Sequence, residues 1–562
     1  MRKNDLPLAW KLYEEGRSYN NRLVPNQYSL VETNTEFFAG NQWLHLPDTP
    51  AMRGLPKPTF NILKRVASLF IASLTSSGVT LRYEPLAYYD GSGTADSHSE
   101  DVTYANAAVK NLLEQFRFDY RIREALFDGA RSGDYCAHFY FDPAASPYGG
   151  TLGQEQGEIC MELVDGINVM FGNPGDIRVE RQPYILVVGR DTVEHLRAEQ
   201  ALWGGTGEIE SDGDTAGMTG VGGRTELSGE EGSKALYVYL YTKQEVEEQG
   251  ADGSVRTVSH VHVTKATKTA VIYENVDTGL SRYPIAWGNW EKQKNQYHGR
   301  ALVTGLVPNQ IFINSMFATA MRHLQLMAFP KTVYNADIIS AWTNEVGQAI
   351  GVHGLQPGQS VSQVAYNLQP AEMSNQIFAL IDKAMAYTKE CLGATDAQMG
   401  TARAENTSAL IVLQTNAQVP LENIRAGLYE WVEDIGAILL DMMGTYYGKR
   451  PIVVEREFQE VLTDSGVPVI DGKSGRMAME RRKRKVVERY DFARFKELWL
   501  KVKCDVGETT YFSEIAQTQT LDNLRREGVL DLIQYLERLP EKHIPRKQEL
   551  IQELKARGEA AR

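Results

Sequence analysis

The sequence contains little cysteine, and the few cysteines are far apart. Four occur in 562 residues, and no C-x-x-C pair is among them: Cys136, Cys160, Cys391 and Cys504. This spacing argues against a disulfide framework and against a zinc site built from thiolates. It fits a chain that folds in a reducing, cytoplasmic environment.

A long uninterrupted hydrophobic run is also missing. The most apolar helical stretch, residues 302–328, is broken by polar residues and a proline: Pro308, Asn309, Gln310, Asn314, Arg322, His323 and Gln325. A membrane-spanning helix needs about 20 predominantly apolar residues, so we expect no membrane span here. The first residues have no apolar core followed by a small-residue cleavage site, so we expect no signal peptide.

Positive charge is in the minority. The chain has 59 lysines and arginines against 72 aspartates and glutamates, which gives a formal net charge of −13. A surface that binds phosphates over the whole protein is therefore excluded. The dense basic run lies within residues 476–489 and is centred on Arg481, Arg482, Lys483, Arg484 and Lys485. Three interpretations of this basic run are open: a contact with DNA phosphates, a solvated face, or a strip of intersubunit salt bridges.

Familiar catalytic and ligand-binding motifs are missing or broken. Neither G-x-S-x-G nor H-E-x-x-H occurs, and the stretch GVPVIDGKS at residues 466–474 has one residue too many between its glycines for a phosphate-binding loop. It is typical of a turn between strands. His260 and His262 alternate onto one face of a predicted strand, but no third ligand has a supporting spacing. We expect exposed strand histidines there, and neither a metal, a cofactor nor a catalytic residue.

Secondary structure is clearly patterned in the first half of the chain. Apolar residues at helical spacing predict a helix over 60–77 with Thr59 as its cap, and a single helix over 101–132 that Gly133 ends. Residues 135–290 alternate β-rich runs with turns, including the hairpin signal Asp252-Gly253. One helix, capped by Asp191 or Thr192, interrupts these strands.

Long helices dominate the second half. Helical patterns cover 302–328, 372–391 and 407–447, and short helices are expected after residue 511. The first two patterns carry apolar stripes that two helices alone would leave wet, which favours burial against neighbouring subunits. The stripes consist of Ile311, Met316, Phe317, Met321 and Leu324, and of Ile377, Leu380, Ile381 and Ala384.

Three stretches in this order carry a family resemblance: FFAGNQW at 37–43, LPKPTFNILKRVASLFIASLTSS at 55–77, and the segment from YPIAWGNW to KTVYN at 283–335. Through them the chain resembles the portal proteins, or head-to-tail connectors, of tailed bacteriophages, in the group related to Salmonella phage portals. The resemblance implies an α+β fold: an elongated protomer with an α/β wing, a two-helix stem, a small α/β clip, a long channel-side helix and a helical crown.

The resemblance also implies how the chain is divided. It assigns residues 1–300 to the wing, with a flexible insertion at 204–233, then 301–328 to the first stem helix, 329–371 to the clip, 372–392 to the second stem helix, 393–406 to the tunnel loop, 407–507 to the channel helix and wing return, and 508–562 to the crown. The Gly-rich insertion departs from the family pattern, and the C-terminal region is too short for the long helical barrel of some relatives.

Function and partners follow from the same resemblance. Portals form a ring, usually of twelve subunits, around a DNA channel at one capsid vertex of the virion, and they assemble in the host cytoplasm. The genome is packaged through this channel and later ejected. The implied partners are double-stranded DNA, the terminase large subunit, the major capsid and scaffolding proteins, and a head-tail adaptor, with no membrane. The alternatives are an ATP-using DNA packaging or remodelling enzyme, and another ring-forming head-tail adaptor.

The tunnel loop provides the expected DNA-proximal residues. Its candidates are Gly393, Thr395, Asp396, Gln398, Gly400, Thr401 and Arg403. The two glycines supply backbone freedom, and Arg403 is the cation able to meet a phosphate directly. In the clip, Trp342 is either an anchor for the terminase and the adaptor or part of a small core.

Overall fold

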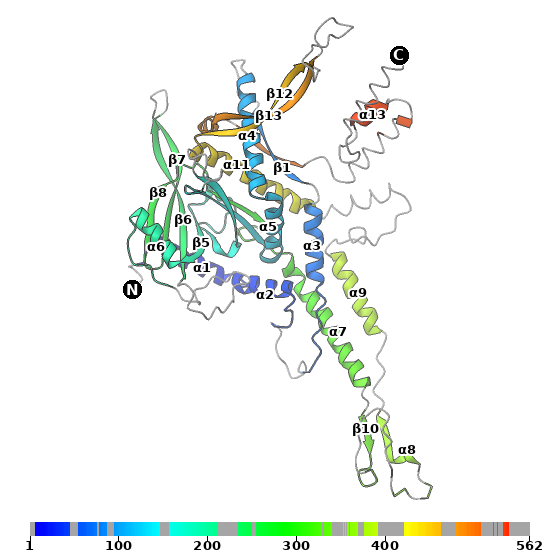
Figure 1. Ribbon diagram of the computed structural model, residues 1–562. Helices are drawn as coiled ribbons and strands as arrows, with labels where there is room; N and C mark the ends of the chain where they lie inside the picture. The colour runs from blue at the N-terminus through cyan, green and yellow to red at the C-terminus, as the bar shows by residue number, and fades with distance from the viewer. Residues whose placement is uncertain are drawn as a thin grey trace. The chain divides into compact units, whose positions relative to one another are not determined.

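The computed structural model contains mixed helices and strands, which confirms the α+β class (Figure 1). It describes residues 6–44, 54–75, 78–86, 95–145, 157–211, 234–249, 255–328, 331–339, 352, 354–355, 357–358, 360–368, 376–391, 421–461, 479–498, 500–506, 521, 525–526 and 532–538. Two compact units are formed, the larger from residues 1–32, 67–302 and 403–562, and the smaller from 33–66 and 303–402.

The N-terminal helices begin and end at local signals. They are α1 Leu8–Arg22, α2 Gln27–Ala39, α3 Ile62–Leu74, α4 Ala95–Gln115 and α5 Phe118–Ser132. The prediction of one helix over 101–132 was wrong, because Arg117 adopts a left-handed conformation (φ 52°) that separates α4 from α5. The cap of α3 is Asn61 and not Thr59, since Asn61 Oδ1 accepts from the Lys64 N–H at 3.0 Å. Gly133 ends α5 as expected, with φ 94°.

The largest sheet is antiparallel and has the order β4-β5-β6-β7-β8. Its strands are β4 Val169–Phe171, β5 Tyr184–Thr192, β6 Lys234–Gln249, β7 Val255–Thr267 and β8 Val271–Asp277. Pairing of Gln249 with Val255 confirms the predicted hairpin between β6 and β7. Leu236, Val238 and Leu240 point to one face and pack with Trp10 of α1. The alternate residue Ala235 packs on the other face with α6 Val193–Trp203, which Thr192 caps.

A second, three-stranded sheet has the order β3-β2-β9, with β2 Asp134–Asp142, β3 Glu158–Val164 and β9 Ile285–Asn289. Helix α11 Glu422–Tyr446 packs against it through Trp431, whose Nε1 donates to the Ala286 carbonyl at 3.1 Å. The same helix lies against the pair β1 Val79–Pro85 and β14 Leu500–Val506. Gly436 permits this approach, since a Cβ there would lie 2.6 Å from Val502 Cγ1.

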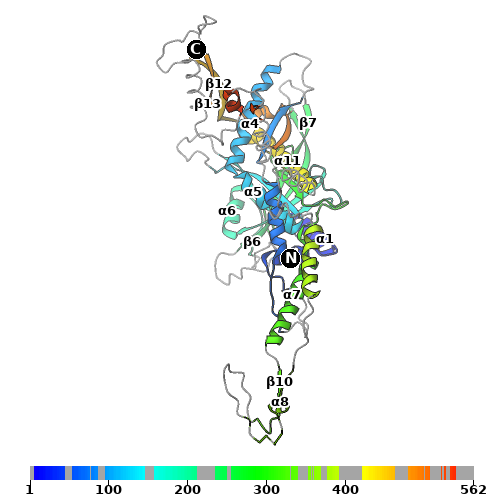
Figure 2. The same ribbon diagram turned by 90° about the vertical axis from the view of Figure 1, so that its right-hand side faces the viewer.

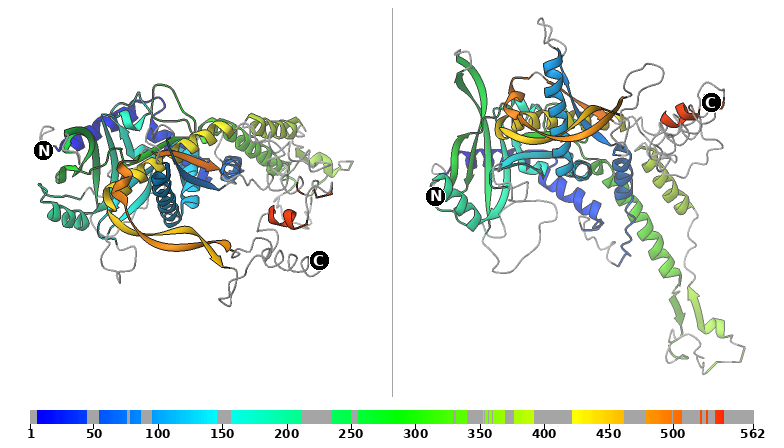
Figure 3. Two further views of the ribbon diagram at one scale, coloured as in Figure 1. Left: turned by 90° about the horizontal axis from the view of Figure 1, so that it is seen from above. Right: turned by 45° about the horizontal axis from the view of Figure 1, so that its top comes forward.

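Strands β12 Lys449–Val461 and β13 Met479–Asp491 form a long antiparallel ribbon (Figure 3). Their register runs from Lys449 opposite Asp491 to Val461 opposite Met479. The GVPVIDGKS stretch between them lies outside the described residues. The strands on either side nevertheless pair as a hairpin does, whereas a phosphate-binding loop joins a strand to a helix. Short 3-10 turns are η2 Gly166–Asn168, η3 Val179–Arg181, η4 Val303–Gly305 and η6 Phe492–Lys496.

From residue 303 on, the smaller unit contains two long helices, one short helix and a two-stranded hairpin. Its elements after η4 are α7 Val307–Ala328, β10 Lys331–Tyr334, α8 Val361–Val364, β11 Ala365–Leu368 and α9 Gln376–Cys391. Helices α7 and α9 lie side by side, and β10 pairs antiparallel with β11 (Figure 2). Near the C-terminus the structure describes α13 Leu532–Arg538. Among the described helices, none is long and apolar enough to cross a membrane.

Candidate subunit interface

A row of buried amide side chains joins α7 to the segments that precede it in the smaller unit. Gln310 Nε2 donates to the Phe60 carbonyl at 2.7 Å and to Asn314 Oδ1 at 2.9 Å. Asn314 Nδ2 donates to Gln42 Oε1 at 2.6 Å, and Gln42 Nε2 donates to the Phe37 carbonyl at 3.1 Å. All three amides are buried. Buried polar groups need such partners, so this amide row explains two of the polar interruptions of α7, Gln310 and Asn314.

The amide row connects the three stretches on which the family resemblance rests. Gln42 belongs to the stretch 37–43, Phe60 to 55–77, and both Gln310 and Asn314 to 283–335. In the sequence, Gln310 and Asn314 served to exclude a membrane span, and their contact with Gln42 was not predicted. The available signal was the four-residue spacing of Gln310 and Asn314, which places two amides on one face of a helix.

Part of the outer surface of the same unit is apolar. Large apolar side chains between 39% and 62% exposed lie on both helices and on the hairpin: Phe312, Met321, Leu324, Val333, Tyr366, Phe378, Leu380 and Tyr387. Of the predicted stripes, Ile381 is buried and Phe317 packs on Phe60 with ring centroids 4.5 Å apart. Met321, Leu324 and Leu380 remain exposed, so the expectation that two helices leave apolar residues wet is confirmed. We call the eight exposed residues the apolar outer face.

The hairpin continues this apolar outer face. Val333 and Tyr366 are directly opposite each other in the β10–β11 register, and both are more than half exposed. Directly opposed residues of an antiparallel pair share one face and normally pack together. Concentrated apolar exposure of this kind marks protein interaction surfaces in soluble proteins. The smaller unit therefore presents a candidate interface that includes both helices and the hairpin.

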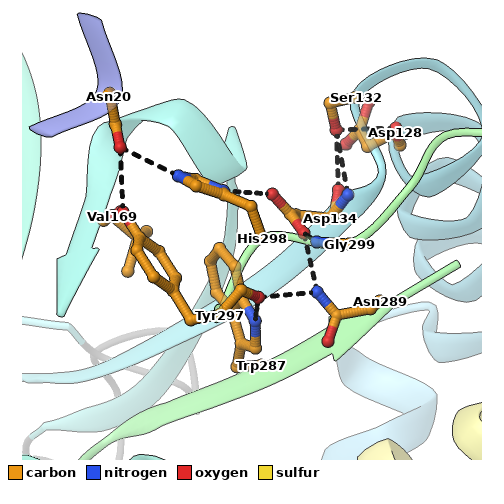
Figure 4. A network of polar contacts seen from close by, with 10 residues as sticks. All are labelled: Asn20, Asp128, Ser132, Asp134, Val169, Trp287, Asn289, Tyr297, His298 and Gly299. Atoms are coloured by element: carbon orange, nitrogen blue, oxygen red, sulfur yellow. Dashed lines mark hydrogen bonds and ion pairs between the residues drawn. The ribbon is translucent and has the colours of Figure 1, made fainter. Parts of the chain in front are cut away.

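A buried charged network lies in the larger unit (Figure 4). The Asp134 carboxylate is fully buried and accepts from Asn289 Nδ2 at 2.7 Å, from the Gly299 N–H at 2.6 Å and from His298 Nδ1 at 2.6 Å. His298 Nε2 lies 3.0 Å from Asn20 Oδ1. The network thus joins α1, β2 and β9 to the residues that lead towards η4.

This network contains a serine, a histidine and an aspartate, but its geometry does not fit nucleophilic catalysis. Ser132 Oγ lies 2.8 Å from the carbonyl oxygens of Asp128 and Asp134, so its proton is directed to the backbone. His298 contacts Asn20 on the side where a catalytic base would contact the nucleophile. The network is therefore structural. Its close packing needs Gly299, where a Cβ would lie 2.7 Å from the Gly133 carbonyl oxygen.

The two strand histidines differ from expectation. His260 and His262 share a face of β7, as the alternation predicted, but both are buried and not exposed. Both contact the neighbouring strand β8: His260 Nδ1 lies 3.0 Å from Asp277 Oδ2, and His262 Nδ1 lies 3.4 Å from the Asn275 carbonyl oxygen. In the described parts of the chain, no group of three or more His, Cys, Asp or Glu side chains could hold a metal ion.

The basic run is placed on β13 of the ribbon. Lys485 lies opposite Glu455, and Arg484 lies opposite Arg456, whose guanidinium binds Glu488 at 2.8 Å and Glu100 at 3.2 Å. The backbone positions of Arg481, Arg482 and Lys483 continue the strand, with Lys483 opposite Glu457. Acidic residues at facing positions offset part of the positive charge of this strand.

The remaining predicted site residues lie outside the described residues. These are all seven tunnel-loop candidates, which fall between the end of α9 at Cys391 and the start of α11 at Glu422, and the clip residue Trp342. Their roles remain predictions.

Comparison with known proteins identifies one family. Residues 219–455 match the model of the phage P22-like portal protein family. The matched span contains β6 to β9, helices α7, α9 and α11, and the β10–β11 hairpin. The two N-terminal stretches at 37–43 and 55–77 precede it. No curated protein matches the chain.

Proposed function

Since residues 219–455 match the phage P22-like portal protein family, we propose that the chain is a tailed-phage portal protein whose copies assemble, most simply as twelve subunits, around a channel for double-stranded DNA. The family is structural and its members are oligomeric rings of the virion capsid. In this proposal the genome is packaged and later ejected through the channel, and the protein acts without catalysis. Tight, magnesium-dependent ATP binding by the purified chain would contradict the last point.

The observation that carries the ring proposal is the apolar outer face of α7, α9 and the hairpin. Transfer of a large apolar side chain from water to a protein interior contributes about 1.5–3 kcal/mol. Eight such side chains are each at least 39% exposed in the isolated chain. Contact with the same elements of neighbouring copies would cover them, because a ring repeats one interface around its axis.

The channel and partner roles rest on the family and on charge. A duplex carries about one negative charge per 1.7 Å of axis, so a wall that bound phosphates strongly would slow its passage. A chain with net charge −13 whose cations are localised suits a conduit. We propose that residues 393–406 face the DNA, with Arg403 meeting phosphates, and that the clip, including Trp342, binds the terminase and then the adaptor. Capsid and scaffolding proteins would bind during assembly in the host cytoplasm.

The test of the ring is a paired substitution on the apolar outer face. Leu324→Glu with Leu380→Glu places charges at two exposed apolar positions, so we expect smaller species in native mass spectrometry and loss of rings in electron micrographs. Circular dichroism should stay unchanged, because neither side chain is in the core. Lys383→Glu, at an exposed polar position of α9, is the matched control and should leave rings intact. Rings formed equally well by the double variant would refute the interface.

A further inference from the structure

Strand β1 has an edge that its sheet partner does not use. In an antiparallel pair, alternate residues direct their N–H and C=O groups toward the partner strand or away from it. Tyr83 belongs to the second kind, because its N–H donates to Asn106 Oδ1 at 2.7 Å and its carbonyl accepts from Asn106 Nδ2 at 3.2 Å. The Asn106 side chain of helix α4 thus binds both backbone groups of Tyr83 on the outer edge, as a neighbouring strand would.

Two more residues direct their backbone to the same edge. Leu81 lies opposite Cys504, whose N–H donates to Glu433 Oε1 at 3.1 Å and so turns away from β1. Leu81 and Val79 therefore share the orientation of Tyr83, with N–H and C=O groups on the edge away from β14. Among the described residues, no strand pairs with this edge. Unpaired edge groups are a ready template for an added strand.

A groove runs along the open part of this edge. Its volume is about 890 Å³, and it is lined by residues of β1, of α4 and of the first turn of α5. That volume is in the range of about 300–1,000 Å³ that ligand sites occupy. Leu113 and Phe118 line it, together with Tyr120, which is 61% exposed. Apolar walls beside an open strand edge suit an extended chain with side chains on both sides.

The charges of the groove favour an acidic occupant. Arg82, Lys110 and Arg117 line it, against Glu114 and Asp119. No salt bridge joins any of these five to another described residue. Cations therefore outnumber carboxylates at a groove in a chain whose net charge is −13. The local sign is opposite to that of the whole protein, which distinguishes this surface from its surroundings.

We propose that this groove binds an extended segment of a separate partner protein, with alternating apolar and acidic residues, as an added strand beside β1. The backbone of Val79 and Leu81 supplies the main-chain hydrogen bonds, the apolar walls take alternate side chains, and the three cations select acidic residues. This binding does not depend on the ring or on DNA passage, since every residue that forms the groove lies in the larger unit.

The experiment measures binding of two labelled peptides to the full chain by fluorescence anisotropy. One peptide alternates valine and glutamate, and the other alternates valine and lysine. We expect the acidic peptide to bind at least about tenfold more tightly, a difference of about 1.4 kcal/mol. Val79→Pro should remove this binding, because it deletes an outer-edge N–H and leaves the β14 ladder intact. Lys110→Glu with Arg117→Glu should reverse the preference, and Lys268→Glu, an exposed cation elsewhere, should not.

Hydrogen exchange separates strand addition from other binding. The acidic peptide should slow exchange of the Val79 and Leu81 amides, whose N–H groups lie on the outer edge where an added strand would form hydrogen bonds. Equal binding of both peptides, binding unaffected by Val79→Pro, or protection confined to other segments would each overturn the proposal. Protection of Val79 and Leu81 that appears on assembly without peptide, and disappears on dilution, would mean that a second copy of the chain occupies the edge. That result would also overturn the proposal of a separate partner protein.

Discussion

Individual residues in this chain matter chiefly through buried polar contacts. Asp134 accepts three hydrogen bonds at full burial, and Asp128 is a largely buried carboxyl beside Arg131. A hydrogen bond to a buried acceptor contributes little net stability, but removal of the acceptor leaves its donors unpaired inside the protein, which is costly. Both carboxyls can therefore be tested through stability.

Replacement of Asp134 by alanine should strongly destabilise the larger unit. The donors on Asn289, His298 and Gly299 would lose their acceptor inside the protein, so we expect the free energy of unfolding to fall by about 3 kcal/mol. Urea unfolding followed by tryptophan fluorescence measures the change. Glu274→Ala, an exposed acid on β8, is the control and should have little effect. A loss as small as that of the control would show that the network does not hold the unit together.

Asp128 should make stability depend on pH. Burial raises the pKa of Asp128 to about 6, although the neighbouring Arg131 acts to lower it. The folded state then holds the proton more tightly than the unfolded state, so stability falls as pH rises from about 4 to 6, by up to about 3 kcal/mol. We expect Asp128→Asn to raise the melting temperature more at pH 7.5 than at pH 4.5. The same shift at both pH values would contradict this assignment.

At the scale of elements, α7 combines a polar inner contact with an apolar outer one. Its amides Gln310 and Asn314 face Phe60 and Gln42, while Met321 and Leu324 are exposed. The helix also buries Ile313 and Ala318, so it differs from an ordinary surface helix in having large apolar residues outside its buried side as well. Such exposed apolar residues are expected of a helix whose remaining contacts are supplied by other copies.

Replacement of Asn314 by leucine tests the amide row. The volume is nearly kept, but Gln42 Oε1 loses its donor and Gln310 loses an acceptor, so we expect about 2 kcal/mol of local destabilisation. Faster hydrogen exchange in residues 37–44 and 307–314 would report it. Thr319→Leu, an exposed position on the same helix, is the control. Unchanged hydrogen exchange in Asn314→Leu would mean that apolar packing can replace the amide hydrogen bonds without loss of stability.

At the scale of the whole molecule, the proposed ring gives a role to one surface and one loop of the chain. The apolar outer face has no function in an isolated protomer, and residues 393–406 connect two helical patterns with small and polar residues. In a ring, the first would form the contacts between subunits and the second would project to the channel. The two features then have separable roles in assembly and in DNA handling.

Shortening of the loop within Gly393–Asn406 should separate these roles. Procapsids should still assemble, because the apolar outer face is intact, while DNA packaging or retention fails. Encapsidated DNA is measured by nuclease protection. An equal shortening within 213–230, in the Gly-rich insertion, is the control and should leave packaging intact. Unimpaired packaging after the loop is shortened would remove its proposed role.

The sequence by itself determined what depends on near neighbours in the chain. Alternation predicted β5 to β8, and Gly133 was predicted to end a helix. Asp191 or Thr192 was expected as a cap, which Thr192 provides, and exposed apolar residues were expected on 302–328 and 372–391. These signals are local, because caps, turns and periodicity involve residues within a few positions of one another.

Only the tertiary structure decided which polar residues are buried. It placed His260 and His262 in contact with β8, assembled Asp134 with His298 and Asn20, and joined Gln42 to Asn314, which are 272 residues apart in the sequence. The break at Arg117 is a left-handed backbone conformation that the helical periodicity did not predict. Burial is set by elements distant in sequence, so a polar residue looks the same in the chain whether water or protein will satisfy it.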